Sequence, residues 1–272
     1  TYGVVSTTVA VMLEAKKGIE RNHNVTGDVG IIGSTNGSIT QAAGKTVTGT
    51  GSVALNAATG IGESDAAIST VADTLSFTNS TSGGVYISNA KAIGVSVSGT
   101  SAGTGKISVI ETAGNIVLGD VITGGDAVTV DSTLGSISAA ADDDVVTGAT
   151  VTLNAYDGIG TNAQAIFTAA DTLEFDNSDS GDVYITNAKA NGSALLVSGM
   201  STGGDISIIE TIDAIKTNGV VSTTGAVMLE AKKGIELNHN VTGDVVIIGS
   251  TNGSITQAAG KTVTGTGSVA LN

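Results

Sequence analysis

The chain has 272 residues, of which 39 are Gly and none is Pro, Cys or Trp, and its net charge is −14. Without Cys it forms no disulfide and no Cys-ligated metal site, and its acidic balance argues against nucleic acid or an anionic membrane surface as a partner. No apolar run approaches the ~18–20 residues of a membrane-spanning helix, so no membrane insertion is expected. Hydrophobic residues make up 40% of the chain and aromatic residues only 3%, which predicts a packed core of Val, Ile, Leu and Ala that excludes large rings.

Short stretches of alternating apolar residues recur along the chain. The first, residues 11–17, has a locally helical composition, but Val11 and Leu13 fit the alternation, with Met12 and Glu14 pointing outward. Such alternation predicts strands, and the Gly- and Asn-rich stretches between them predict turns. The alternating pairs are Val53/Leu55, Leu75/Phe77, Val85/Ile87, Val95/Val97, Ile107/Val109, Ile116/Leu118, Val128/Val130 and Val151/Leu153. Single isoleucines follow Gly turns at Ile19, Ile39, Ile61, Ile137, Ile159, Ile235 and Ile255.

The chain also repeats itself over a long interval. Residues 1–56 and 217–272 are identical at 52 of 56 positions, so the second stretch restarts the sequence of the first. We therefore expect residues 1–216 to be one full repeat and 217–272 to begin the next copy. A weaker internal repeat relates residues 55–112 to 153–211. Because the sequence starts at Thr1 and stops within a strand-like pattern, we expect it to be a piece of a longer protein.

The spacing of the predicted strands indicates the architecture. Between Val53 and its equivalent Val269 there are roughly 20 strand steps, two to a coil, or about ten coils of about 21.6 residues. A sandwich or an up-and-down barrel supplies short strands but gives no reason for the long repeat, and the Gly content opposes helices. The sequence therefore predicts an all-β, right-handed parallel β-helix (a β-solenoid) with about 21–22 residues per coil, continuous over residues 1–272.

The four differences between the copies test this prediction. We expect Gly30/Val246 to point outward and Val9/Gly225 to lie at a strand edge. The pair Tyr2/Asn218 is expected in a loop. Arg21/Leu237 has the parity of an inward residue, but an unpaired Arg is costly in an apolar core. We therefore expect that strand to end by residue 20, leaving position 21 on a corner.

Two recurring motifs resemble those of a known family. Gly-x-Ile turns occur at residues 37–39, 114–116 and 135–137, and Gly-Asp-Val-x-Ile segments occur at 27–31, 181–185 and 243–247. Together they resemble the repeats of filamentous-haemagglutinin-type adhesins, which are large secreted bacterial proteins with a β-helical shaft. The resemblance implies an extracellular or cell-surface filament of bacterial origin.

Few residues suggest a chemical site. The run Asp142, Asp143 and Asp144 lies on a predicted turn, and if it were extended, Asp142 and Asp144 would share a face. A solvated acidic loop, a calcium site and a catalytic carboxylate pair are the three interpretations, and calcium is the one cofactor that the sequence suggests. His23 and His239 are copies of one position and are expected on exposed turns. No pattern of nucleophile, base and acid stands out, so we do not expect an enzyme.

The function expected from these features is structural and adhesive: a rod segment of a long, tandem-repeat filament outside the cell. Its partners would be further copies of the same repeat stacked end to end, neighbouring filaments, or a surface glycan or receptor. Tyr86 and Tyr184 occupy equivalent, outward-facing positions that could mark such contacts. The alternatives are a β-helical polysaccharide-active module that uses Asp142, Asp143 and Asp144, and a self-assembling extracellular matrix fibre.

Overall fold

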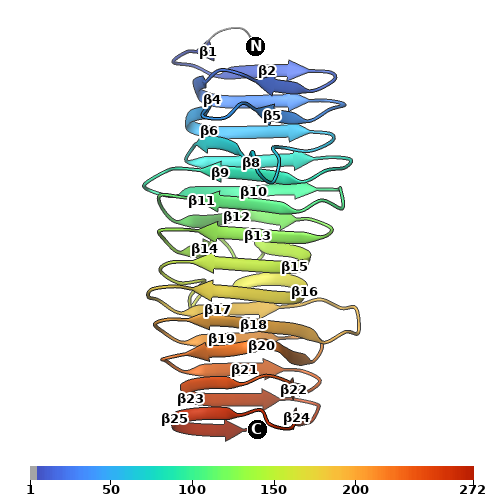
Figure 1. Cartoon of the computed structure of the whole chain (residues 1–272), viewed down its shortest axis with the longest axis vertical. Coiled ribbons are helices and arrows are strands. Elements are labelled where there is room, and N and C mark those ends of the chain that lie inside the picture. The colour runs from blue at the N-terminus through green and yellow to red at the C-terminus, as the bar shows by residue number, and fades with distance from the viewer. Residues whose placement is uncertain (1–4) are drawn as a thin grey trace. The chain divides into compact units, whose positions relative to one another are not determined.

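A computed structural model describes residues 5–272, apart from the side chains of residues 120 and 121. The chain divides into two compact units, Thr1–Gly135 and Ser136–Asn272, called here the first and the second unit. All regular elements in the described residues are β-strands, and within each unit they lie one below another (Figure 1). The prediction of an all-β parallel solenoid is confirmed. Continuity over residues 1–272 stays a prediction, and the expected loop at Tyr2 lies outside the described residues.

The strands have the following bounds. In the first unit they are β1 (Val5–Ser6), β2 (Val11–Ala15), β3 (Ile19–Arg21), β4 (Val25–Ser34), β5 (Ile39–Gln41), β6 (Val47–Ala57), β7 (Ile68–Val71), β8 (Thr74–Asn79), β9 (Val85–Asn89), β10 (Val95–Ser101), β11 (Ile107–Glu111), β12 (Ile116–Thr123) and β13 (Ala127–Ser132). In the second unit they are β14 (Ile137–Ala139), β15 (Val145–Ala155), β16 (Ile166–Asn177), β17 (Val183–Asn187), β18 (Leu195–Ser201), β19 (Ile206–Glu210), β20 (Ile215–Thr223), β21 (Val227–Ala231), β22 (Ile235–Leu237), β23 (Val241–Ser250), β24 (Ile255–Gln257) and β25 (Val263–Leu271).

Parallel pairing sets the length of a coil, which is one full turn of the backbone. In the first unit Asn89 lies opposite Glu111, which is 22 residues further along the chain. In the second unit the step is 19 residues from Thr168 to Asn187. It is 24 residues from Asn177 to Ser201. The predicted coil length of about 21–22 residues lies within this range.

The strand segments of successive coils stack in three columns, as in the pairs Ile19 with Ile39, Val25 with Val47, and Gly30 with Val53. Strands inside the stack are hydrogen-bonded on both edges, as β8 is with β6 before it and β10 after it. Pairing on both edges satisfies the backbone polar groups of these strands and leaves them no free edge.

The core of each unit is a stack of inward-facing aliphatic side chains. All eight alternating pairs expected from the sequence are buried, and most of their members, such as Val53 and Leu55, are 0% exposed. Val11–Ala15 forms strand β2 rather than a helix, with Met12 61% exposed, as expected. The expected exclusion of large rings is wrong at Phe77 and Phe175, which are 2% and 4% exposed. Each ring lies opposite a glycine of the next coil, Gly99 or Gly199, which leaves room for it.

The two 56-residue copies fold alike. Strands β2, β3, β4, β5 and β6 of the first copy begin at the residues that correspond to the first residues of β21, β22, β23, β24 and β25. The pairing register is also shared, because Val11 lies opposite Gly30 and Val227 lies opposite Val246. The differing pair Val9/Gly225 lies just before β2 and β21, as expected. The long sequence repeat is therefore also a repeat of strand bounds and register.

Three predictions about the differences between the copies are wrong. Asn218, expected in a loop together with Tyr2, lies within β20, where the pairing with β18 shifts register between Thr217 and Val221. Position 30/246 faces inward, and Val246 is 0% exposed. The reason is a register shift between Gly27 and Val29, which changes the phase of the alternation within β4. Position 21/237 is also inside, because Arg21 is the last residue of β3 and is 0% exposed.

Candidate functional site

The acidic run Asp142, Asp143 and Asp144 lies on the turn between β14 and β15. Asp144 is 5% exposed, and its Oδ2 accepts a 2.7 Å hydrogen bond from the backbone N–H of Ala141. Asp142 and Asp143 are exposed. The run is thus not extended, and its third carboxylate closes the turn. In residues 5–272, no three His, Cys, Asp or Glu side chains are grouped so that they could hold a metal ion, and calcium binding here stays a prediction.

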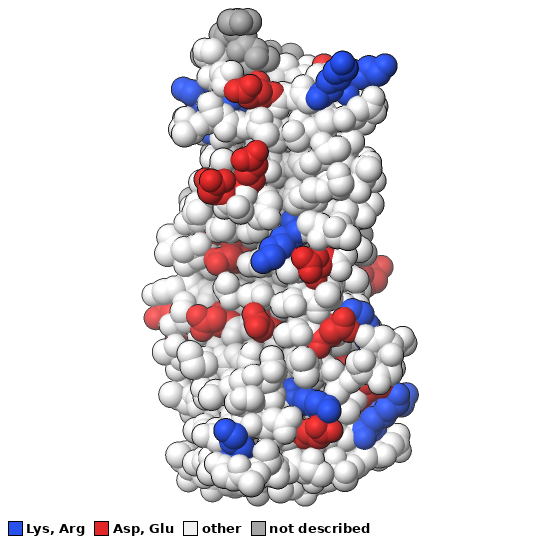
Figure 2. Space-filling model, turned by 45° about the vertical axis from the view of Figure 1, so that its right-hand side comes forward, with Lys and Arg blue, Asp and Glu red and all other residues white. Residues whose placement is uncertain are grey.

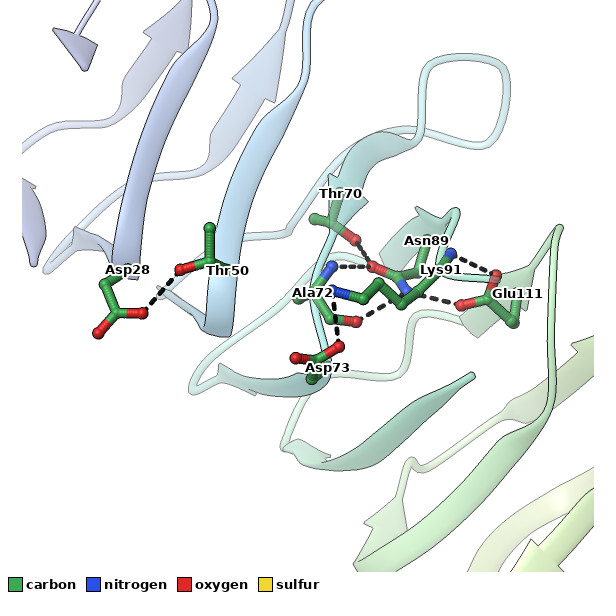
Figure 3. Close-up of polar contacts among 8 residues, drawn as sticks. All are labelled: Asp28, Thr50, Thr70, Ala72, Asp73, Asn89, Lys91 and Glu111. Carbon is green, nitrogen blue, oxygen red and sulfur yellow. Dashed lines mark hydrogen bonds and ion pairs between the residues drawn. The ribbon is translucent and has the colours of Figure 1, made fainter. Parts of the chain in front are cut away.

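A buried polar network occupies one edge of the core in the first unit (Figure 3). Thr70, Asn89 and Glu111 lie opposite one another in successive coils, and none is more than 1% exposed. Asn89 Oδ1 accepts hydrogen bonds from the hydroxyl of Thr70 (2.7 Å) and the N–H of Ala72 (3.0 Å). Its Nδ2 donates to Glu111 Oε2 at 2.6 Å.

The Glu111 carboxylate accepts three hydrogen bonds from other groups of the protein. Besides the Asn89 amide, it accepts 2.9 Å hydrogen bonds from the backbone N–H groups of Lys91 and Ala113. These groups belong to turns that would otherwise leave N–H groups without an acceptor. The buried carboxylate therefore holds two turns together, and its hydrogen-bonding capacity is taken up by the fold.

The second unit builds the same network. Thr168, Asn187 and Glu210 replace Thr70, Asn89 and Glu111, and Asn187 Nδ2 donates to Glu210 Oε2 at 2.6 Å. The sequence contained a signal for these residues, because each stands two residues after an inward-facing apolar residue of its own strand. Glu111, for example, follows Ile107 and Val109 at the same spacing of two. Their polar character obscured that signal.

A second asparagine, the last residue of β8 in the first unit and of β16 in the second, supports neighbouring turns. Asn79 Oδ1 accepts from the N–H of Gly60 at 2.9 Å, and Asn79 Nδ2 donates to the carbonyls of Ser82 and Gly83 and to Ser101 Oγ. Asn177 makes the corresponding bonds in the second unit, starting with the N–H of Gly158 at 2.8 Å. These asparagines satisfy the backbone of successive coils, which is a structural role.

Polar contacts between coils also occur on the outside. Lys91 pairs with Asp73 at 2.7 Å and Lys189 pairs with Asp171 at 2.8 Å, at equivalent positions of the internal repeat. The Thr50 hydroxyl donates to Asp28 Oδ1 at 2.7 Å (Figure 3). On the face drawn in Figure 2, charged side chains are scattered over a mostly uncharged surface, and several acidic ones lie next to basic ones. The charged groups on this face are therefore spread out rather than gathered in one patch.

The histidines differ from the expectation of exposed turn residues. Both lie on turns, but both are half-buried. His239 contacts Thr217 of the preceding coil. Its imidazole Nδ1 lies 3.0 Å from the carbonyl oxygen of Thr217, and its backbone N–H donates a hydrogen bond to the Thr217 hydroxyl.

An outer groove in the second unit brings together two residues that the sequence singled out, Asp142 and Tyr184. Phe167 lies opposite Thr186, and Tyr184 lies opposite Ser207, so large and small outward side chains alternate across the coils. The small residues leave a hollow of about 290 Å³. The lining also includes Asn162, Ala163, Ala165, Ile209 and Met228. We call this site the Phe167–Tyr184 groove.

The environment of Tyr184 is acidic. Burial first, and then the negative charges of Asp182 and Asp205, raise the pKa of its phenol above 10.0. The hydroxyl is hydrogen-bonded to the Asp182 carboxylate, which also accepts a 2.8 Å hydrogen bond from the N–H of Asp205. The groove is thus a hollow with both apolar and polar walls beside acidic side chains.

Comparison with protein-family models, with curated proteins and with solved structures gives no match. In the described part of the chain, no helix is long and apolar enough to cross a membrane.

Proposed function

We propose that this chain is a structural segment of a long extracellular or cell-surface filament, in which tandem copies of the repeat formed by residues 1–216 extend one β-solenoid. The observation that carries the proposal is the agreement between the two 56-residue copies, which share strand bounds and pairing register. A repeat that preserves register lets each copy offer the next one the same strand edge and the same core.

The packing of successive coils supports this role. In the first copy, Val53 and Leu55 are 0% exposed because β8 places Leu75 and Phe77 against them. A following coil thus completes this strand face, and tandem copies would complete each such face in the same way.

The buried polar residues support a structural role as well. The side chains of Asn79, Asn89 and Glu111 are engaged by the backbone and side chains of adjacent coils. Because the same bonds recur in the second unit, each stretch of solenoid carries its own turn supports. The net charge of −14 would keep neighbouring shafts apart and leave end-to-end continuation as the favoured association. The resemblance to filamentous-haemagglutinin-type adhesins is consistent with this location and role.

The proposal predicts how particle length depends on repeat number. Proteins with one, two and three copies of residues 1–216 would be purified and imaged by negative-stain electron microscopy. With about ten coils spaced by ~4.8 Å, each added copy should lengthen a thin rod by roughly 48 Å at constant width. Particles that grow in all dimensions, or that fold into separate globules, would refute the proposal.

A further inference from the structure

The Phe167–Tyr184 groove combines apolar and polar walls with negative charge. Among the described residues that line it, Asp142 is charged and no Lys or Arg is present. Glu230 lies opposite Ile209 on the outer face and is exposed, and Asp182 and Asp205 lie beside the Tyr184 hydroxyl. A ligand in the groove therefore meets a negative potential from several sides.

This combination restricts the chemistry of the occupant. An anion would be repelled by the carboxylates, and a purely apolar group would leave the rim carboxylate of Asp142 without a role in recognition. Aromatic rings attract cations, and the contribution is about 0.5–1 kcal/mol at exposed sites. The alkyl stem of a basic side chain packs on apolar surface while its charged end remains at the rim.

We propose that the Phe167–Tyr184 groove binds a lysine or arginine side chain presented by a partner protein. The stem lies between Phe167, Tyr184 and Met228, and the cation lies toward Asp142. The hydroxyls of Thr186 and Ser207, on the floor of the groove, accept hydrogen bonds from the bound group. This inference goes beyond the filament role, and its failure would leave the dependence of length on repeat number untouched.

The first unit supplies a matched comparison, because its coils follow the same order of strands. Tyr86 retains the tyrosine, but Ser69 replaces Phe167, Thr129 replaces Met228 and Gly44 replaces Asp142, while Asp65 stands at the position of Ala163. The tyrosine of the first unit therefore lacks the second ring and the carboxylate at the position of Asp142, and its nearest equivalent carboxylate, Asp65, lies at a different position. The first unit should therefore not bind the same ligand.

The methionines provide a direct readout, because the chain contains three, at positions 12, 200 and 228. With 13C-methyl-labelled methionine, the whole chain would be titrated with acetyl-Gly-Lys-Gly-amide and acetyl-Gly-Arg-Gly-amide. The Met228 signal should shift in a saturable way. The Met12 signal should not, although residues 11–15 and 227–231 are identical in sequence, and the exposed Met200 should also be unaffected.

A peptide with norleucine in place of lysine keeps the alkyl stem and removes the charge, so its affinity should be lower. Asp142→Asn should weaken binding of the lysine peptide by roughly two- to fivefold. Phe167→Ser, which installs the residue of the first unit, should abolish the shift. Asp126→Asn, an exposed turn carboxylate of the first unit, is the control for net charge and should have no effect.

Three results would overturn the proposal. One is an unchanged Met228 signal with both basic peptides. Another is that the norleucine and lysine peptides bind with equal affinity and that Asp142→Asn changes neither affinity. This result would mean that the charge of the ligand is not recognised. The third is a larger Met228 shift with a neutral disaccharide such as maltose than with either basic peptide. A far-UV circular dichroism spectrum and a melting temperature unchanged from the parent would show that the fold of each variant is intact.

Discussion

Arg21 and Leu237 stand at the same position of the two 56-residue copies, and both side chains are buried, at 0% and 1% exposure. The arginine is held by hydrogen bonds, from Nη1 to Gln41 Oε1 at 2.5 Å and from Nη2 to the carbonyl of Thr46 at 3.0 Å. No carboxylate balances its charge in these bonds. Desolvation lowers the pKa of Arg21 from 12.5 to about 10, which shows that burial disfavours the charged form.

Arg21→Leu should therefore stabilise the protein. The second copy shows that the same strand accepts leucine at this position, and replacing a buried charge by a well-packed apolar side chain is often stabilising by about 1–3 kcal/mol. Urea unfolding followed by circular dichroism should show a higher midpoint. The reciprocal change, Leu237→Arg, should lower the midpoint by a similar amount. A lower midpoint for Arg21→Leu would mean that the hydrogen bonds of Arg21 outweigh its desolvation.

Asn79→Ala should be strongly destabilising. The substitution removes the acceptor of the Gly60 N–H and the donor to the carbonyls of Ser82 and Gly83, all in the interior of a turn. Leaving such groups unsatisfied costs about 1–3 kcal/mol each, and we expect a total loss of about 2–4 kcal/mol of unfolding free energy. Asn56→Ala changes an exposed asparagine of the same sheet and should stay within about 0.5 kcal/mol. Equal effects of the two changes would contradict the structural role of Asn79.

Local sequence pattern is enough to predict the strands and the coil. Alternation with a period of two identifies the inward residues of β6, β9 and β11 without knowledge of their neighbours, and the long repeat favours a solenoid. The prediction fails at Gly30 because a one-residue register shift reverses the facing of all residues that follow. That shift depends on the pairing of β4 with β6, which the sequence of β4 alone does not encode.

The Phe167–Tyr184 groove depends on neighbours in other coils. The sequence correctly predicts that Tyr184 faces outward, but its partners in the groove lie in other strands, Phe167 in β16 and Met228 in β21. Which residues meet depends on the length of each coil, and in the second unit paired residues are between 19 residues and 24 residues apart. The register must therefore be known before the groove can be recognised.

The fit of Phe77 against Gly99 leads to a packing prediction. A Cβ atom at position 99 would lie 2.6 Å from ring atoms of Phe77, so Gly99→Ala should cost about 1–3 kcal/mol through overpacking. Combining it with Phe77→Leu should recover part of the loss, because the smaller side chain vacates that space. Gly33→Ala is the control, since its Cβ would meet Glu14 Cγ at an ordinary 3.7 Å. Thermal unfolding of the parent, the two single variants and the double variant decides this, and additive losses would show that the ring and the glycine are not coupled.

The ion pair between Lys233 and Asp213 should make stability depend on pH. Lys233 Nζ lies 2.5 Å from Asp213 Oδ1, and this hydrogen bond is the main reason why the pKa of Asp213 falls below 3.8. A carboxyl whose pKa is lower in the folded state contributes stability above its unfolded pKa, and that stability is lost as pH falls through the folded value. Lys233→Gln should therefore lower the melting temperature at pH 7, and the difference from the parent protein should shrink below about pH 4. Lys17→Gln, at the equivalent position of the first copy, should show no such pH-dependent difference. A difference for Lys233→Gln that stays constant from pH 7 to pH 2 would mean that the lysine stabilises the fold through packing of its stem rather than through the charge of Asp213.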